Sequence, residues 1–175
     1  MLPIITLIGL PGSGKSTVGR QLARKWRLPF VDSDHAIEDA LGGSIRSYFE
    51  SHGESAFRDV ETDVLRSLLQ QQQGCVLSTG GGSVLREENR RMLREQSTVF
   101  YLQAAPEDIA RRLRHDTTRP LMQGADPLVR LKELLAQRAP LYQETAHFVI
   151  DTGRLNTSQT VRKVAMQAEL SGMLS

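Results

Sequence analysis

The chain has 175 residues, 39% hydrophobic and 24% charged, which is ordinary for a globular protein and excludes disordered, collagen-like and coiled-coil chains. Its net charge of +2, from 22 Lys and Arg against 20 Asp and Glu, gives no indication of a nucleic acid or anionic membrane as partner. The single cysteine, Cys75, excludes an intrachain disulfide, and glycine and proline interrupt the apolar start from position 9, before it is long enough to span a membrane. We therefore expect one cytoplasmic domain over residues 1–175.

Five short apolar runs alternate with longer amphipathic segments. The runs expected to be strands are 4–8, 30–31, 76–78, 99–102 and 148–150. The helical patterns are the segment 18–26 and the stripes formed by Leu65, Leu68 and Leu69, by Ile109 and Leu113, by Leu131, Leu134, Leu135 and Leu141, and by Val161, Val164 and Ala168. This alternation predicts an α/β three-layer sandwich, with a five-stranded parallel sheet flanked by helices.

Two stretches depart from this alternation. Residues 33–61 carry helical patterns without a strand, with Ser44 as a helix N-cap before Ile45, and are interpreted as an excursion from the sheet. Residues 114–126 are polar and without periodicity. Because loops of this length in compact domains are usually functional, we interpret 114–126 as a lid.

The segment Gly9–Ser16 matches the P-loop pattern G-x-x-x-x-G-K-[ST], and it follows an expected strand and opens an expected helix. A chance match has a probability of roughly a few in a thousand for this composition, and the strand–helix context lowers it further. Glycine lets backbone N–H groups converge on phosphate, Lys15 would reach the β- and γ-phosphates, and the Ser16 hydroxyl would ligate Mg²⁺. A dinucleotide-binding alternative is discarded, because Thr17 stands where its third glycine is required. The expected nucleotide-binding residues of the loop are Gly12, Ser13, Gly14, Lys15, Ser16 and Thr17.

Asp32 and Asp34 follow the second expected strand, where the carboxyl ends of parallel strands face a ligand crevice. Asp32 is a candidate ligand of Mg²⁺, directly or through water. Asp34 is a candidate acceptor of hydrogen bonds from substrate hydroxyls and of a proton. The alternative is that Asp34 is only the N-cap of the next helix.

Two further features indicate an acceptor site. Arg58 suits a substrate carboxylate, with Glu61 one turn away to hold its guanidinium, although a surface ion pair is an equal alternative. Gly80, Gly81 and Gly82 follow the third expected strand and offer bare backbone to a ligand, the alternative being a flexible turn.

Three more arginines are candidates for anionic or planar groups. Arg119, in the expected lid, would stabilise charge on the transferring phosphoryl group. Arg112 would stack on adenine, and Arg138 would be a second clamp on the acceptor. The alternative for each is a solvated surface position.

The order and spacing of these motifs resemble the shikimate kinase family, which has a nucleoside-monophosphate-kinase-like P-loop fold with a lid and a substrate-binding subdomain. The resemblance runs from the first strand to about Asp151 and fades after Thr152. The segments that carry it are GLPGSGKSTVGRQLA, FVDSDHAIE, GESAFRDVE, VLSTGGG, TTRPLM and LLAQRAPLY. Tyr48 departs from the pattern, since an aliphatic residue is more usual there.

The resemblance implies a monomer that transfers the γ-phosphoryl group of ATP to the 3-hydroxyl of shikimate, in chorismate and aromatic amino acid biosynthesis. It implies catalytic roles for Lys15, Asp34 and Arg119, Mg²⁺ held by Ser16 and Asp32, and adenine stacked on Arg112. The shikimate-binding residues it implies are Asp34, Arg58, Gly80, Gly81, Gly82 and Arg138. The apolar residues it places beside the ring are Phe49, Phe57, Pro120 and Leu121.

Two other functions are open to a chain with a P-loop. A gluconate kinase would share the P-loop and an acidic residue after the second strand, but it gives no reason for the Phe57-Arg58, Gly80–Gly82 and Arg119-Pro120-Leu121 set. A nucleotide-binding regulatory module without catalysis would have no need of the acceptor residue Asp34. A measurement of ADP release with shikimate, with gluconate and without an acceptor separates the shikimate kinase, the gluconate kinase and the regulatory module.

Overall fold

The structure is a computed structural model, and it describes residues 3–114 and 126–173. Five parallel strands form one sheet in the order β2-β3-β1-β4-β5. The strands are β1 Ile4–Ile8, β2 Phe30–Asp32, β3 Cys75–Ser78, β4 Thr98–Gln103 and β5 Phe148–Asp151. Every expected strand is present, and each end lies within one residue of its prediction.

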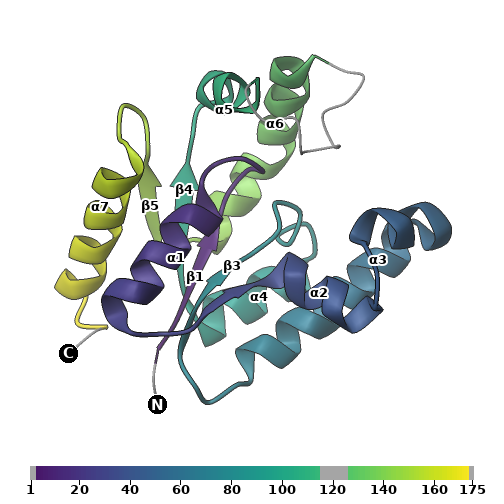
Figure 1. Cartoon of the computed structure of the whole chain (residues 1–175), viewed down its shortest axis with the longest axis horizontal. Helices are drawn as coiled ribbons and strands as arrows, with labels where there is room; N and C mark the ends of the chain where they lie inside the picture. The colour runs from purple at the N-terminus through teal and green to yellow at the C-terminus, as the bar shows by residue number, and fades with distance from the viewer. Residues whose placement is uncertain (1–2, 115–125, 174–175) are drawn as a thin grey trace.

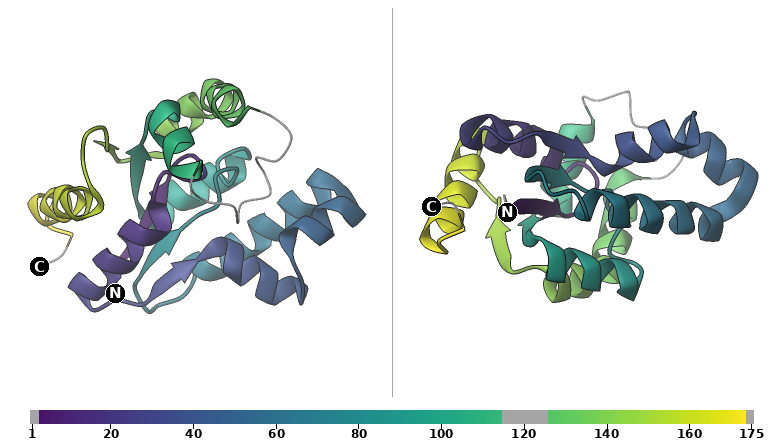
Figure 2. Two further views of the ribbon diagram at one scale, coloured as in Figure 1. Left: turned by 45° about the horizontal axis from the view of Figure 1, so that its top comes forward. Right: turned by 90° about the horizontal axis from the view of Figure 1, so that it is seen from below.

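Helices cover both faces of this sheet (Figures 1 and 2). In the described part of the chain they are α1 Lys15–Trp26, α2 Ser33–Leu41, α3 Ile45–Leu69, α4 Glu87–Gln96, α5 Pro106–Leu113, α6 Pro127–Thr145 and α7 Thr157–Leu170. On one face α1 and α7 pack over buried side chains such as Leu7 and Phe100. On the other, α3, α4 and α6 pack over residues such as Ile8 and Leu77. This arrangement confirms the predicted three-layer α/β sandwich.

The excursion from the sheet consists of α2 and the first part of α3, which project to the right in Figure 1. Ser44 is the N-cap of α3 as predicted, because its hydroxyl accepts a hydrogen bond from the Ser47 amide at 3.1 Å. Helical geometry is interrupted at Gly53 (φ 85°, ψ 173°), in a region that glycine adopts far more readily than other residues. After this break α3 returns to the core.

Strand order places the topological switch point of the sheet between β1 and β3. The chain leaves β1 through α1 on one face of the sheet and leaves β3 through α4 on the other. The two strands are neighbours in register, with Leu7 opposite Ser78, so both loops start at the same edge. In open α/β sheets ligands bind at such a switch point. The P-loop and the Gly80–Gly82 loop lie there.

No helix in the described ranges has both the length and the apolar character needed to cross a membrane.

Candidate active site

The P-loop connects β1 to the N-terminus of α1. Gly12 (φ 82°) and Gly14 (φ 92°) adopt left-handed backbone geometry that disfavours side chains. Lys15 is only 8% exposed, and its ammonium donates hydrogen bonds to the carbonyls of Gly9 and Leu10, each at 2.8 Å. A cation is thus held beside a helix N-terminus, where amide groups and the helix dipole attract phosphate.

Ser16 and Asp32 meet at the end of β2. The Ser16 hydroxyl donates to Asp32 Oδ2 at 3.3 Å, while Asp32 Oδ1 accepts from the Asp34 amide at 2.9 Å. Asp32 is therefore the N-cap of α2, and the interpretation of Asp34 as that cap is wrong. Asp34 is the second residue of the helix, and its carboxylate is available for other interactions because it does not serve as the cap.

The environment of Asp34 makes its carboxylate a better base. Burial raises its pKa from 3.8 to about 6, and the negative charges of Asp32 and Glu61 add to the effect. Lys15 opposes it. A carboxylate of this pKa is ionised at neutral pH and is matched to accepting a proton near that pH.

The glycine loop, Gly80–Gly82, lies against the side chains predicted to bind the acceptor. A Cβ on Gly80 would lie 2.7 Å from Asp34 Oδ1. A Cβ on Gly81 would lie 2.7 Å from Pro11 Cδ and 3.1 Å from Arg138 Nη1. These approaches require glycine, which favours the close-approach interpretation of the loop over a flexible turn.

Arg58 lies against the third glycine of the loop. A Cβ on Gly82 would lie 2.6 Å from both Nη atoms of Arg58. Arg58 Nη1 donates to Glu61 Oε1 at 2.9 Å, and the two side chains are 13% and 1% exposed. The alternative of a surface ion pair is therefore wrong for Arg58 and Glu61. The loop brings Arg58, Arg138 and Asp34 to one place.

Both arginines retain hydrogen-bonding capacity. The Nε atoms of Arg58 and Arg138 are buried and have no acceptor among the described residues. Glu61 partly balances the charge: burial raises its pKa, whereas Arg58 above all, and then Arg138, lower it. The site can therefore hold an anionic group beside a carboxylate.

Gly82→Ala tests the contact between the loop and Arg58. The new methyl group would meet the far end of a flexible side chain, so we expect the fold to persist and the guanidinium to move. A misplacement of this kind is expected to raise the KM for an anionic acceptor about tenfold, with the KM for ATP unchanged. Steady-state kinetics checks this, with Gly43→Ala as the matched control, since a Cβ there meets no atom within 4 Å. An unchanged acceptor KM in Gly82→Ala would contradict the geometry.

The nucleotide side of the site is described only in part. Arg112, an exposed residue of α5, has its Nη1 atom 3.9 Å from a Cβ built on Gly14, so it lies over the P-loop. Of the expected lid 114–126, Arg114 and Asp126 are described. Arg119, Pro120 and Leu121 lie outside the described residues.

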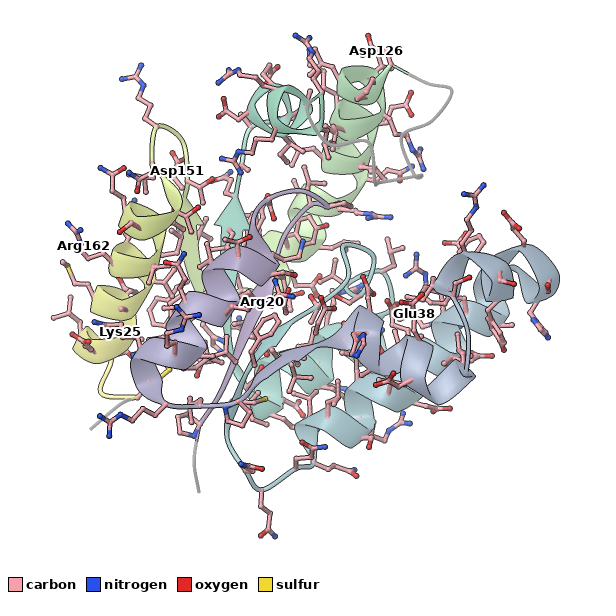
Figure 3. All side chains as sticks on the ribbon, viewed as in Figure 1. Arg20, Lys25, Glu38, Asp126, Asp151 and Arg162 are labelled. Atoms are coloured by element: carbon pink, nitrogen blue, oxygen red, sulfur yellow. The ribbon has the colours of Figure 1, made fainter. Side chains whose placement is uncertain are left out.

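A pocket of about 440 Å³ adjoins the two aspartates. Its other lining residues are Arg20, Phe30, His35 and Glu38. Figure 3 labels two of them, Arg20 on α1 and Glu38 on α2. The carboxylates of Asp32, Asp34 and Glu38 and the guanidinium of Arg20 therefore give this pocket a charged lining.

Sequence reasoning missed three buried side chains that bond to the loop around Gly80–Gly82: Ser33, Asn89 and Tyr142. Two features of the sequence could have drawn attention to such residues. One is a polar residue in a segment expected to be apolar, and the other is the asparagine Asn89 within a helix, where asparagine has a low propensity. Neither signal identifies the loop as the partner.

Comparison with known proteins identifies the family of this chain. The family model for shikimate kinase matches residues 11–169. A shikimate kinase of Paracidovorax citrulli is 57% identical over 171 residues, covering 97% of this chain and 93% of that protein. The structure of shikimate kinase from Acinetobacter baumannii in complex with shikimate is similar, with a TM-score of 0.89, 40% identity and coverage of 100% and 97%.

A gluconokinase from Sinorhizobium meliloti shares the fold at lower similarity. Its TM-score is 0.64 and its identity 22%, with coverage of 99% of this chain and 97% of that one. This likeness concerns the fold alone, whereas the family model and the relatives at higher identity agree on one family. The chain belongs to the shikimate kinase family.

Proposed function

We propose that this protein transfers the γ-phosphoryl group of ATP to the 3-hydroxyl of shikimate, giving shikimate 3-phosphate and ADP, in chorismate and aromatic amino acid biosynthesis. The observation that carries the proposal is the glycine loop, which lies against a carboxylate of raised pKa and two partly buried arginines. Shikimate combines one carboxylate with three hydroxyls, so it needs cations and hydroxyl acceptors side by side. The similar structure from Acinetobacter baumannii is a complex with shikimate.

In this proposal Arg58 and Arg138 bind the shikimate carboxylate, and Gly80–Gly82 provide backbone groups for the ring hydroxyls. Asp34 orients the attacking 3-hydroxyl and takes its proton. Phosphoryl transfer has a loose transition state, so orientation and charge neutralisation contribute more to the rate than the strength of the base. Residues 33–61 form the substrate-binding part of the domain.

ATP is bound through the loop residues Gly12, Ser13, Gly14, Lys15, Ser16 and Thr17. Lys15 neutralises charge on the β- and γ-phosphates, Arg112 stacks on adenine, and Arg119 is brought over the phosphates by a lid at 114–126.

Ser16 and Asp32 fit a magnesium ion. Their oxygens lie 3.3 Å apart beside the P-loop, and Mg²⁺ prefers oxygen ligands, one or two from the protein and the rest from phosphates and water. When bound, Mg²⁺ neutralises negative charge on the nucleotide phosphates. We propose that Ser16 and Asp32 hold it, in a monomer that acts in the cytoplasm.

Coupled measurement of ADP release tests the function against both alternatives. We expect release that depends on shikimate, with little in the presence of gluconate or without an acceptor. Gluconate-dependent release would identify the other kinase. Equal release in all three mixtures would refute a kinase acting on either acceptor.

A further inference from the structure

The glycine loop has no side chains with which to fix its own position. It nevertheless lies against Asp34, Arg58 and Arg138, at distances that leave no space for a Cβ. An error of 1 Å in the loop would move its backbone groups relative to all three side chains. Its position must therefore be set by other residues.

Three fully buried side chains from three different helices each bond to one backbone group around this loop. Ser33 of α2 accepts a hydrogen bond from the Gly80 amide at 3.2 Å. Tyr142 of α6 donates to the Gly81 carbonyl at 2.6 Å. Asn89 of α4 donates to the Ser83 carbonyl at 3.0 Å.

Two of these side chains also bond to the elements that carry the arginines. The Asn89 amide oxygen accepts from the Thr62 hydroxyl at 2.8 Å, and Thr62 lies one turn after Arg58 on α3. Asn89 thus connects the loop to the helix of Arg58. The Tyr142 hydroxyl interacts with the guanidinium of Arg138 one turn earlier on α6.

These bonds are directional, and the two bonds of Asn89 are buried while those of Ser33 and Tyr142 to the loop are partly buried. A buried polar group that loses its partner is strongly disfavoured, so the bonds from three buried side chains favour one arrangement of the loop over others. Apolar packing at the same places would tolerate small shifts of the backbone.

We propose that Ser33, Asn89 and Tyr142 are positioning residues that hold the glycine loop in the geometry required to bind shikimate. They act through the backbone of the loop and do not themselves contact the substrate. This inference rests on the proposed function, since it assigns the loop to the acceptor and not to the nucleotide.

Tyr142→Phe and Asn89→Leu test the proposal through KM values. In each variant we expect the KM for shikimate to rise about five- to tenfold while the KM for ATP changes by less than about twofold. The side chain of Asn89 bonds to Thr62 and to the Ser83 carbonyl and not to either arginine, so its effect separates the position of the loop from the position of the arginines. If Asn89→Leu does not fold, Thr62→Val replaces it, because this variant removes only the bond between Thr62 and Asn89. We expect the same selective rise in the KM for shikimate in Thr62→Val. Thr62→Ser keeps the hydroxyl and is expected to behave as the wild type.

Two variants control for the loss of a buried hydroxyl. Tyr101→Phe removes the hydroxyl of the ring next to Tyr142, at a centroid distance of 4.9 Å. Thr6→Val removes the partly buried bond from Thr6 to Ser97, which is 2.8 Å long. We expect both to leave the two KM values unchanged, even where thermal stability falls.

The outcomes are distinct. A selective rise in the shikimate KM supports the inference. Unchanged KM values, or equal increases for both substrates, would overturn it while the wild-type enzyme remains active on shikimate. A wild-type protein without shikimate-dependent ADP release would overturn the proposed function and this inference together.

Discussion

Asp34→Asn is expected to lower kcat at least about 100-fold, the range for loss of a positioned general base. The amide cannot accept the proton of the attacking hydroxyl, although it keeps the size of the carboxylate. ATP binding should persist, because the P-loop and Lys15 are unchanged. Steady-state kinetics and nucleotide binding check this, with Asp39→Asn, an exposed residue of the same helix, as the control. Near-normal turnover by Asp34→Asn would exclude the role.

The same substitution is expected to stabilise the protein. Because the pKa of Asp34 is raised from 3.8 to about 6 in the folded state, ionisation of this group destabilises the fold at neutral pH. Removing the charge should increase the free energy of unfolding at pH 7.5 by about 2 kcal/mol, after allowing for partial exposure. The gain should shrink as pH falls through 6 and vanish near pH 4.

Urea unfolding at pH 7.5 and pH 4 measures this difference. The pH dependence of the wild-type enzyme gives a second test, since kcat/KM should fall as Asp34 is protonated below about pH 6. A variant that is inactive and also less stable at pH 7.5 would indicate damage to the fold rather than loss of a base.

Arg58→Ala is expected to raise the KM for shikimate about 30- to 100-fold, because each hydrogen bond to a charged group contributes about 1.5–3 kcal/mol. The KM for ATP should change little. The variant also leaves Glu61, 1% exposed, without its nearest cation, so stability should fall at neutral pH. Since Arg58 lowers the pKa of Glu61, its removal raises that pKa further, and the lost stability should return as pH falls and Glu61 is protonated.

Two variants separate binding from stability at this position. Arg58→Lys keeps a cation but not the planar pair of donors, so the shikimate KM should still rise while stability is largely kept. The double variant Arg58→Ala/Glu61→Gln removes the unpaired charge and should regain stability without regaining affinity. Equal increases in both KM values in Arg58→Ala would contradict a carboxylate clamp.

Local sequence patterns were sufficient for the sheet and the P-loop. The five apolar runs and the Gly9–Ser16 motif are contiguous in the chain, and each is specified by its own residues. No apolar stripe was predicted for helix α4, because in Glu87–Gln96 only Met92 and Leu93 are buried apolar residues, too few to form a visible stripe. The break in α3 at Gly53 was also missed, since a glycine within a helical pattern does not by itself show where the helix bends.

The sequence motifs identify the candidate site residues one at a time, but they do not show how these residues contact one another. Sequence spacing left Arg58 and Glu61 as an open choice between a surface pair and a clamp, and their burial excludes the surface pair. The N-cap of α2 is Asp32 rather than Asp34, a difference of backbone geometry that composition does not reveal. The bonds of Ser33, Asn89 and Tyr142 to the loop join distant segments and arise only when the helices pack on the sheet.

The position of the phosphate on the product tests the central claim most directly. The protein is incubated with ATP and shikimate, and the product is analysed by phosphorus–proton correlation NMR, with ADP measured in parallel. We predict one phosphate ester, coupled to the ring proton at C3, in an amount equal to the ADP formed. A phosphate on another hydroxyl, or inorganic phosphate alone, would contradict the account.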